Sequence, residues 1–245
     1  MTSFCRRVEM QIVRIVVFLV VVVLTLTASV QADTFGTGVN QFTIDFVPIS
    51  GSSNPTSGYG IVNNDYRMGT FEITNNQWTK FVNSYGMPIG DPSDAYDHES
   101  KFTGVNVPTD CVSWYEAAQF VNWLNTSTGY QAAYKFTGTQ GTANYTMTTW
   151  VSTDTGYNVS NPYRNSDAFY FLPTEDEWVK AAYWNGTSLQ TYATKNGSTP
   201  VSGTDSNYNV NMVTGQPWDV GSGSEELNGT FDMMGNVCEW MESPF

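Results

Sequence analysis

Three segments of the chain combine a helix-start signal with a helical spacing of apolar residues. Each start is a Thr or Ser followed three residues later by Gln or Glu, an arrangement in which the two side chains satisfy exposed N–H groups reciprocally. The pairs are Thr74 with Gln77, Ser113 with Glu116, and Thr174 with Glu177. Apolar residues then recur in steps of three and four, so each predicted helix has one apolar stripe, which we expect to pack in a core. The stripe residues are Trp78, Phe81, Val82, Tyr85, Ala117, Phe120, Val121, Leu124, Trp178, Ala181 and Ala182.

The rest of the chain predicts short strands and many loops. Alternation of apolar and polar positions predicts strands at residues 41–47 and 168–172, and a long polar connection extends over residues 126–165. Gly, Asn, Ser and Thr occur throughout, while aromatic residues make up 15% of the chain, which indicates loops anchored by large buried rings. We find neither an exact repeat nor a domain linker. This pattern predicts one α+β domain with few helices.

The first 32 residues have the three zones of a secretory signal. Arginines come first, an apolar run follows from Ile15 to Leu26, and small residues lead to Ala32. The alternative is a membrane anchor, but an uninterrupted span needs roughly 20 apolar residues, and this run is broken well short of that. We therefore predict a signal peptide over residues 1–32, cleavage after Ala32, and a secreted, periplasmic or cell-surface domain over residues 33–245 with no membrane span.

The predicted mature chain is strongly acidic. Cleavage leaves 7 basic residues (10 − 3) and 22 acidic residues (23 − 1) in residues 33–245, a net charge of −15. Nucleic acid and anionic lipid are therefore poor partners, and a protein or peptide is the ligand class that we expect. Such acidity is typical of a solvated surface, and it also suits cations that prefer oxygen ligands, such as calcium.

Four segments carry the strongest motifs. They are MGTFEITNNQ at residues 68–77, VSWYEAA at 112–118, FLPTEDEW at 171–178, and GTFDMMGNVCEW at 229–240. In this order, and covering about residues 59–242, they resemble the sulfatase-modifying factor or formylglycine-generating enzyme family. The lead-in Gly58-Tyr59-Gly60 further resembles a secreted bacterial subgroup of that family.

The resemblance implies a compact, loop-rich fold of the C-type-lectin-like kind with few short helices and bound calcium. Catalytic members oxidise a target cysteine to formylglycine with a cysteine pair that holds copper(I), an ion suited to soft thiolates. The family places this pair after the segment matching Gly235–Trp240, and therefore beyond Phe245. We expect no catalytic and no cofactor-binding residue in the chain as given, which is C-terminally truncated relative to the family.

Two hypotheses about function remain open. In the first, the chain is an exported, non-catalytic member of the family, and its calcium-braced fold serves as a binding or surface module. In the second, it is a truncated copper-dependent oxidase whose catalytic cysteines lie beyond residue 245, and only then is copper a cofactor.

Several residues depart from the pattern of the enzymes. Phe171 replaces a common Arg, which removes an ion-pair anchor and leaves a packing residue. Val121 stands where some enzymes have a disulfide cysteine. Cys238 replaces a usual Trp, and Cys111 falls at no catalytic position. In an oxidising compartment these two cysteines either form one disulfide or remain two buried thiols.

One site of the family maps onto this chain. The resemblance assigns calcium ligands to Asp232, Gly235, Val237 and Glu239, with side-chain oxygens from the two acids and main-chain carbonyls from the other two. Calcium takes several hard oxygen ligands, and a loop containing glycine can turn its carbonyls inward. The alternative is that Asp232 caps a turn and Glu239 faces solvent. A second family calcium site would begin near Asn207 and Tyr208, although the loop that follows is shorter here.

The remaining titratable residues favour no other chemistry. His98 is the only histidine, and it lies in an acidic loop where a surface position is expected. One histidine is too few for a multi-histidine iron site or a zinc hydrolase. Carboxylates such as Asp154 and the pair Glu225 and Glu226 have the chemistry for acid–base work, but solvated loops explain them better.

Overall fold

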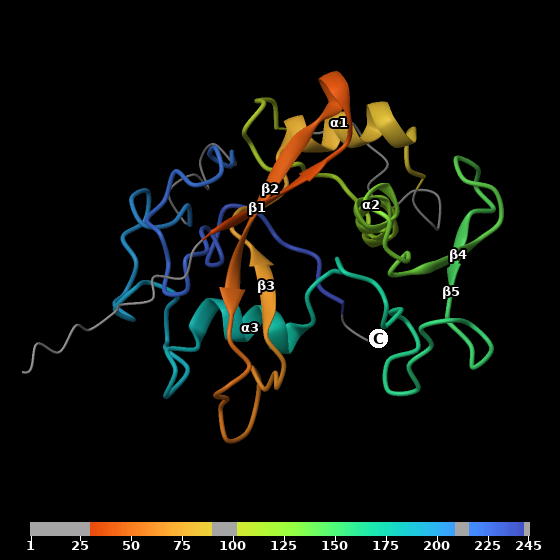
Figure 1. The fold of residues 1–245 in the computed structure, drawn as a ribbon. Coiled ribbons are helices and arrows are strands. Elements are labelled where there is room, and N and C mark those ends of the chain that lie inside the picture. Colours follow the sequence, from red (N-terminus) through yellow and green to blue (C-terminus); the bar gives the residue numbers. More distant parts are fainter. Residues whose placement is uncertain (1–29, 90–101, 209–215, 243–245) are drawn as a thin grey trace, which may run out of the picture.

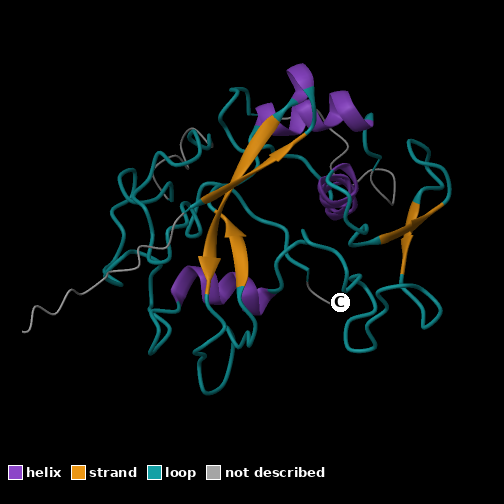
Figure 2. Cartoon of the chain, viewed as in Figure 1, coloured by secondary structure: helices purple, strands orange, loops and turns teal. Residues whose placement is uncertain are grey.

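The computed structural model describes residues 30–89, 102–208 and 216–242, and loops make up most of this part of the chain (Figure 2). Short helices and strands are set among the loops (Figure 1). The elements are β1 (Gln31–Phe35), the 3-10 helix η1 (Gly38–Asn40), β2 (Phe42–Ile49), β3 (Tyr66–Gly69), α1 (Asn75–Tyr85), α2 (Trp114–Ser127), β4 (Lys135–Thr137), β5 (Thr146–Thr148) and α3 (Glu175–Tyr183). This confirms the loop-rich α+β class.

The three helices begin where the capping pairs predict. Thr74, Ser113 and Thr174 are the residues that precede the first turns of α1, α2 and α3, and each side-chain oxygen accepts a hydrogen bond from the N–H three residues later. The Gln or Glu side chain accepts the N–H of the capping residue in return. Because this pairing satisfies N–H groups that the helix itself leaves exposed, a local motif determines the helix start.

The main sheet is antiparallel and has the strand order β1-β2-β3. Its central strand β2 confirms the strand predicted at residues 41–47, with Gln31 opposite Phe46 on one side and Gly69 opposite Phe46 on the other. Residues 1–29 of the predicted signal lie outside the described residues. Gln31 and Ala32 are the first residues of β1, so a chain that began at Asp33 would keep the last three pairs of this strand with β2.

The strand predicted at residues 168–172 is wrong. This segment has no strand partner, because the buried side chain of Asn125 on α2 takes the place of one. Its Oδ1 accepts the N–H groups of Phe169 and Tyr170 at 2.8 and 3.0 Å, and its Nδ2 donates to the carbonyl of Tyr170 at 2.7 Å. One amide side chain thus satisfies backbone groups that a neighbouring strand would otherwise pair with.

The long polar connection contains a hairpin that the sequence pattern did not predict. Strands β4 and β5 pair antiparallel, with Phe136 opposite Met147. The Nζ of Lys135 pairs with the carboxylate of Asp154 at 2.5 Å, and this ion pair ties the hairpin to the loop that follows. Each strand has only three residues, which is too short for alternation to distinguish it from a loop.

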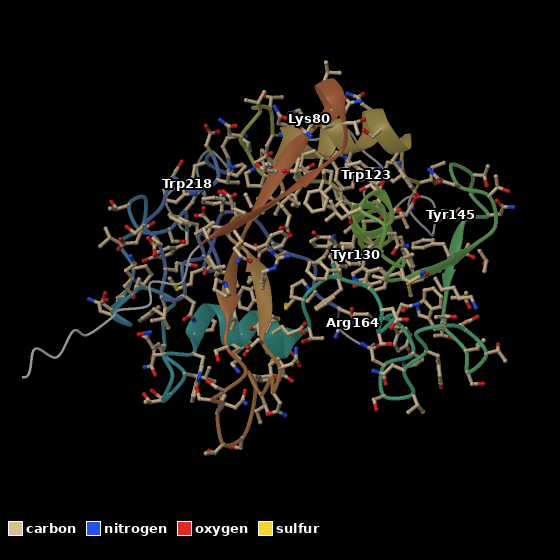
Figure 3. All side chains as sticks on the ribbon, in the orientation of Figure 1. Lys80, Trp123, Tyr130, Tyr145, Arg164 and Trp218 are labelled. Carbon is tan, nitrogen blue, oxygen red and sulfur yellow. The ribbon has the colours of Figure 1, made fainter. Side chains whose placement is uncertain are left out.

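The buried apolar residues form two clusters, one at the start and one at the end of β2. The larger one joins β1 and the start of β2 to α1 and α2, and it contains Phe81 at 0% exposure. The ring of Phe81 lies 5.1 Å from that of Phe120 and 5.5 Å from that of Trp123, a residue of α2 that Figure 3 labels. The smaller cluster joins the end of β2 to Ala181 and Ala182 of α3. The helical stripes therefore pack in cores, as predicted.

The last described residues return to the start of α2. The indole Nε1 of Trp240 donates to the carbonyl of Val112 at 2.7 Å, and the indole Nε1 of Trp114 donates to the carbonyl of Met241 at 3.1 Å. The Glu242 carboxylate accepts the hydroxyl of buried Tyr134 at 2.9 Å. These contacts hold the segment that precedes them, which carries the predicted calcium ligands. No helix within the described ranges is long and apolar enough to cross a membrane.

Candidate functional site

Asp232 lies at the centre of the predicted metal site and is only 2% exposed. Its Oδ1 accepts the indole N–H of Trp218 at 2.8 Å, and its Oδ2 accepts the N–H of Gly221 at 3.3 Å. The φ angle of Asp232 is 62°, a left-handed conformation that Asp and Asn adopt more readily than most residues. Its carbonyl accepts the N–H of Gly235 at 3.1 Å. The alternative of a turn cap therefore explains the backbone, but not the burial of the carboxylate.

Asn236 joins three segments of the chain close to the Asp232 carboxylate. Its Oδ1 accepts the N–H of Trp218 at 3.0 Å and the amide of Asn207 at 3.2 Å, and its own N–H donates to the carbonyl of Asn207 at 3.1 Å. The Nδ2 of Asn236 donates to the Oε1 of Glu72 at 3.0 Å. Segments far apart in the sequence therefore converge on residues 232–239.

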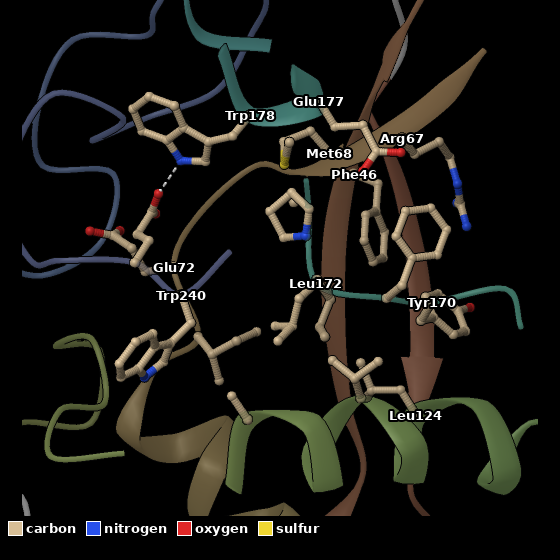
Figure 4. A pocket seen from close by; sticks show the side chains of 18 of the residues that line it. Phe46, Arg67, Met68, Glu72, Leu124, Tyr170, Leu172, Glu177, Trp178 and Trp240 are labelled. Atoms are coloured by element: carbon tan, nitrogen blue, oxygen red, sulfur yellow. Dashed lines mark hydrogen bonds between the residues drawn. The ribbon is translucent and has the colours of Figure 1, made fainter. Parts of the chain in front are cut away.

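Glu239 does not face solvent as the alternative suggested. It is partly buried, and its Oε2 accepts the indole N–H of Trp178 on α3 at 2.6 Å, the contact drawn in Figure 4. Trp178 was expected only to pack. Its ring also provides the hydrogen bond that orients the second predicted acidic ligand.

Glu72 belongs to the same group of acids, although the sequence did not single it out. It follows β3, more than 150 residues before Asp232, and its Oε2 is buried with no hydrogen-bond partner among the described residues. An orphaned carboxylate oxygen of this kind is uncommon in a folded protein, because burial without a partner is costly. The only signal in the sequence was its place inside the first family motif.

The electrostatics of these acids indicate uncompensated negative charge. Burial, together with the nearby carboxylates of Asp232 and Glu239, raises the pKa of Glu72 to about 8. Burial also raises the pKa of Asp232, and the hydrogen bonds from Trp218 and Gly221 offset part of this rise. Burial raises the pKa of Glu239 as well. The hydrogen bond from Trp178 lowers this pKa, and the charge of Asp232 raises it. Such a group of acids favours a proton or a cation.

The residues present fit the calcium site that the sequence predicts. Asp232, Gly235, Val237 and Glu239 all line one open cavity of about 490 Å³. Among the described residues, no three Asp, Glu, Cys or His side chains converge closely enough to hold a metal alone, so a cation here would also need main-chain carbonyls. The predicted set supplies two. No hydrogen bond to the carbonyls of Gly235 or Val237 is present in the described part of the chain.

The second calcium site predicted near Asn207 and Tyr208 is only partly described, because residues 209–215 lie outside the described residues. Asn207 is already used by Asn236, and the carbonyl of Tyr208 accepts the hydroxyl of Ser202. The structure therefore brings Asn207 beside the first site, and the second site stays a prediction.

A comparison with known protein families identifies the family of this chain. The model of the sulfatase-modifying factor enzyme 1-like domain (FGE-sulfatase) matches residues 27–245. The chain belongs to this family. No curated protein sequence matches.

Two solved structures share the fold. Treponema denticola variable protein 1 is 21% identical with a TM-score of 0.55, over 88% of this chain and 77% of that chain. CarF is 20% identical with a TM-score of 0.50, over 89% of this chain and 80% of that chain. At these identities the likeness shows the fold alone.

The two cysteines of this FGE-sulfatase domain do not form a disulfide in the structure. The Sγ of Cys111 donates to the carboxylate of Asp110 at 3.2 Å, in a left-handed turn just before α2. Cys238 is exposed, so the prediction of a disulfide or of two buried thiols is wrong for this residue. Its neighbours Val237 and Glu239 are less exposed.

Phe171 has the packing role that was predicted, because it packs against the larger core, and an arginine lies over its ring. The guanidinium of Arg164 lies 3.9 Å from the centre of the Phe171 ring, and it pairs with Glu177 at 3.7 Å and with Glu242 at 3.6 Å. Arg164, from an earlier loop, thus joins the Phe171 ring to acids of α3 and of the last described residues. Val121, at the other departure from the family, is buried in the larger core at 6% exposure.

The remaining candidate residues divide between surface and core. Glu225 is exposed and pairs with Lys195 at 3.1 Å, as expected for a solvated loop. Its neighbour Glu226 is 2% exposed, so the prediction of a solvated position is wrong there, because adjacent residues of an extended segment face opposite sides. Asp154 pairs with Lys135. His98 lies outside the described residues.

Proposed function

We propose that this protein is an exported, non-catalytic member of the FGE-sulfatase family, in which a calcium ion braces residues 232–239 and the folded surface binds a protein or peptide. One observation carries the calcium brace. Asp232 and Glu239 line a single cavity together with Gly235 and Val237, and among the described residues no basic side chain lines it. Calcium would supply positive charge there and join the loop of Asp232 to α3 through Glu239 and Trp178.

Calcium should raise the melting temperature of the protein. A ligand that binds only the native state at about a hundredfold its dissociation constant stabilises it by about 2.7 kcal/mol. We expect this gain to disappear in Asp232→Asn, which keeps the shape of the side chain and removes its charge. Thermal melts with calcium and with a chelator measure the effect.

The matched control is Asp219→Asn, because Asp219 is an exposed carboxylate on the same loop as Trp218. This variant should respond to calcium as the unmodified protein does. A calcium shift of the same size in Asp232→Asn, or no shift in the unmodified protein, would contradict the proposed brace.

Export predicts a mature chain that begins at Asp33. The small residue Ala32 ends a signal whose apolar run is too short for an anchor. An intact mass of the exported protein measures the start of the chain directly. Retention of residues 1–32 in the exported form would show that the signal is not cleaved.

The non-catalytic assignment predicts that residues 33–245 do not convert the cysteine of a sulfatase-type peptide to formylglycine when copper is supplied. Oxidation of this kind needs two thiolates on one copper(I) ion, whereas Cys111 faces Asp110 and Cys238 is exposed. The mass of the peptide after incubation with copper and oxygen is the measurement. Conversion that is lost in Cys111→Ser or Cys238→Ser would instead make this chain an oxidase with a relocated site.

A further inference from the structure

The chain contains three Asn-Gly pairs, at residues 185–186, 196–197 and 228–229. Asparagine is among the thermolabile residues. The carbon of its side-chain amide lies within reach of the nitrogen of the next residue, and glycine has no Cβ to obstruct an attack by that nitrogen. In all three pairs the residue after glycine is Thr or Ser. Because the local sequences are so similar, differences in their reactivity must come from the fold.

The attacking nitrogen is held at two of the three pairs. The N–H of Gly197 donates to the carbonyl of Thr194 at 3.0 Å, and the N–H of Gly229 donates to the carbonyl of Glu226 at 3.2 Å. The N–H of Gly186 is in an exposed turn and makes no hydrogen bond to another described residue. Attack requires this nitrogen to lose its proton, so Gly186 reacts without first breaking a hydrogen bond of the fold.

Access differs in the same direction. Asn228 is partly buried, and its Nδ2 donates to the carbonyls of Ala181 and Trp184 at 2.9 and 3.1 Å. These contacts hold the nitrogen that would have to leave. Asn185 is exposed, and a Cβ at Gly186 would meet no atom of the described residues within 4 Å beyond its chain neighbours.

The side-chain carbonyl of Asn185 is also polarised by hydrogen-bond donors. Its Oδ1 accepts the N–H of Thr187 at 3.0 Å, the hydroxyl of Thr187 at 2.9 Å and the N–H of Ser188 at 2.8 Å. At Asn196 the corresponding donors are the N–H and the hydroxyl of Ser198. Attack on Cγ places negative charge on Oδ1, and donors that already contact this oxygen stabilise the charge.

We propose that Asn185 is a site of self-modification through a succinimide, and that it reacts before Asn196 and Asn228. The nitrogen of Gly186 loses its proton to solvent base and bonds to Cγ of Asn185, while the Cγ–Nδ2 bond breaks and Nδ2 takes up a proton and leaves as ammonia. Water then opens the ring. Cleavage of the new bond gives aspartate, and cleavage of the original peptide bond gives isoaspartate. Water is the only other reactant, and the reaction depends neither on calcium nor on the proposed binding role.

The product changes how this turn is joined to α3. The helix ends at Tyr183, so a carboxylate at residue 185 meets the negative end of its dipole. Isoaspartate also lengthens the main chain by a methylene group inside a turn whose ends are fixed. Trp184 and Leu189 pair as an antiparallel bridge, and the N–H of Gln190 donates to the carbonyl of Tyr183 at 2.9 Å. We therefore expect the amide of Gln190 to lose protection from hydrogen exchange in the isoaspartate form.

Incubation of the full folded chain in heavy-oxygen water at mildly alkaline pH measures the three rates, because the label marks only sites that convert during the incubation. Trypsin cleaves after Lys180 and Lys195, which separates Asn185 from the other two sites, and fragmentation of the next peptide resolves those. We expect Asn185 to convert about fivefold faster than Asn196, the scale of one hydrogen bond, and by a larger factor than Asn228.

The same chain in denaturant is the matched control, since the three similar local sequences should there convert at nearly equal rates. Thr187→Val removes the hydroxyl donor and keeps the shape of the side chain. It should slow conversion of Asn185 about fivefold in the folded chain and leave the rate in denaturant unchanged. Thr187→Ser keeps the hydroxyl and should convert as the unmodified chain does.

Three results would overturn the proposal. They are the same ratio of rates in the folded and denatured chain, conversion of Asn196 or Asn228 in the folded chain at least as fast as that of Asn185, and an unchanged rate in folded Thr187→Val. The ratios in the unmodified chain decide the matter even if Thr187→Val does not fold.

Discussion

Asn125→Ala should reduce the free energy of unfolding by at least about 3 kcal/mol. The side chain is 0% exposed, and it satisfies the N–H groups of Phe169 and Tyr170 and the carbonyl of Tyr170. Alanine leaves these three part-buried backbone groups without this partner, and each lost hydrogen bond costs roughly 1 kcal/mol. Denaturant unfolding followed by tryptophan fluorescence measures the loss.

Two further variants make this prediction specific. Asn125→Asp keeps an oxygen for the two N–H groups and removes the donor to Tyr170, so its loss should be smaller than that of the alanine variant. Asn158→Ala removes a similar contact, from its Oδ1 to the N–H of Ser160, at an exposed position. That control should stay within about 0.5 kcal/mol of the unmodified protein. A loss of the same size in Asn158→Ala would show that burial of the amide is not the cause.

The second large effect concerns the pH dependence of stability. The pKa of Glu226 is raised from 4.5 to about 7, mainly by burial. The hydrogen bonds from Thr230 and Met233 lower this pKa, and the charges of Asp232 and Glu239 raise it. Its Oε1 is buried without a partner among the described residues. Between pH 4.5 and 7, the carboxyl group of Glu226 is therefore protonated in the folded chain and ionised in the unfolded chain. Its contribution to the free energy of unfolding is fully present below pH 4.5 and is lost as the pH rises through about 7.

Glu226→Gln should remove this loss. A rise in pKa from 4.5 to about 7 corresponds to roughly 3 kcal/mol at pH 8, because each unit is worth about 1.4 kcal/mol. The variant should match the unmodified protein near pH 5 and exceed its free energy of unfolding by roughly that amount at pH 8. Denaturant unfolding across this pH range, with a chelator present, provides the measurement.

The adjacent residue supplies the control. Glu225 is exposed and pairs with Lys195, so Glu225→Gln should leave the slope of stability against pH above 5 nearly unchanged. If both variants retained the slope of the unmodified protein, another group would be responsible for the pH dependence.

Local signals in the sequence were sufficient for the helices. A capping pair such as Ser113 and Glu116 satisfies N–H groups within one turn, so its geometry depends on no distant residue. The apolar stripe that follows then determines which face turns inward. The family motifs likewise placed Asp232 and Glu239, because these residues lie within one short segment.

The strand predicted at residues 168–172 shows where such reasoning fails. Alternation there was real, but a strand requires a backbone partner, and the sequence does not reveal that a side chain of α2 satisfies these groups instead. The contact between Arg164 and Phe171 was hidden for the same reason. Arg164 precedes Phe171 in another loop, and only the folded chain brings its guanidinium over that ring.

By itself the sequence determined the family, the loop-rich class, the three helix starts and the acids of residues 232–239, since each depends on residues close together in the chain. Only the tertiary structure decided which groups share the site. Glu72, Trp178 and Trp218 reach Asp232 and Glu239 from other segments, and it is their convergence that buries the acids and leaves one carboxylate oxygen without a partner. Burial and hydrogen bonding are properties of that convergence, because no single segment excludes water alone.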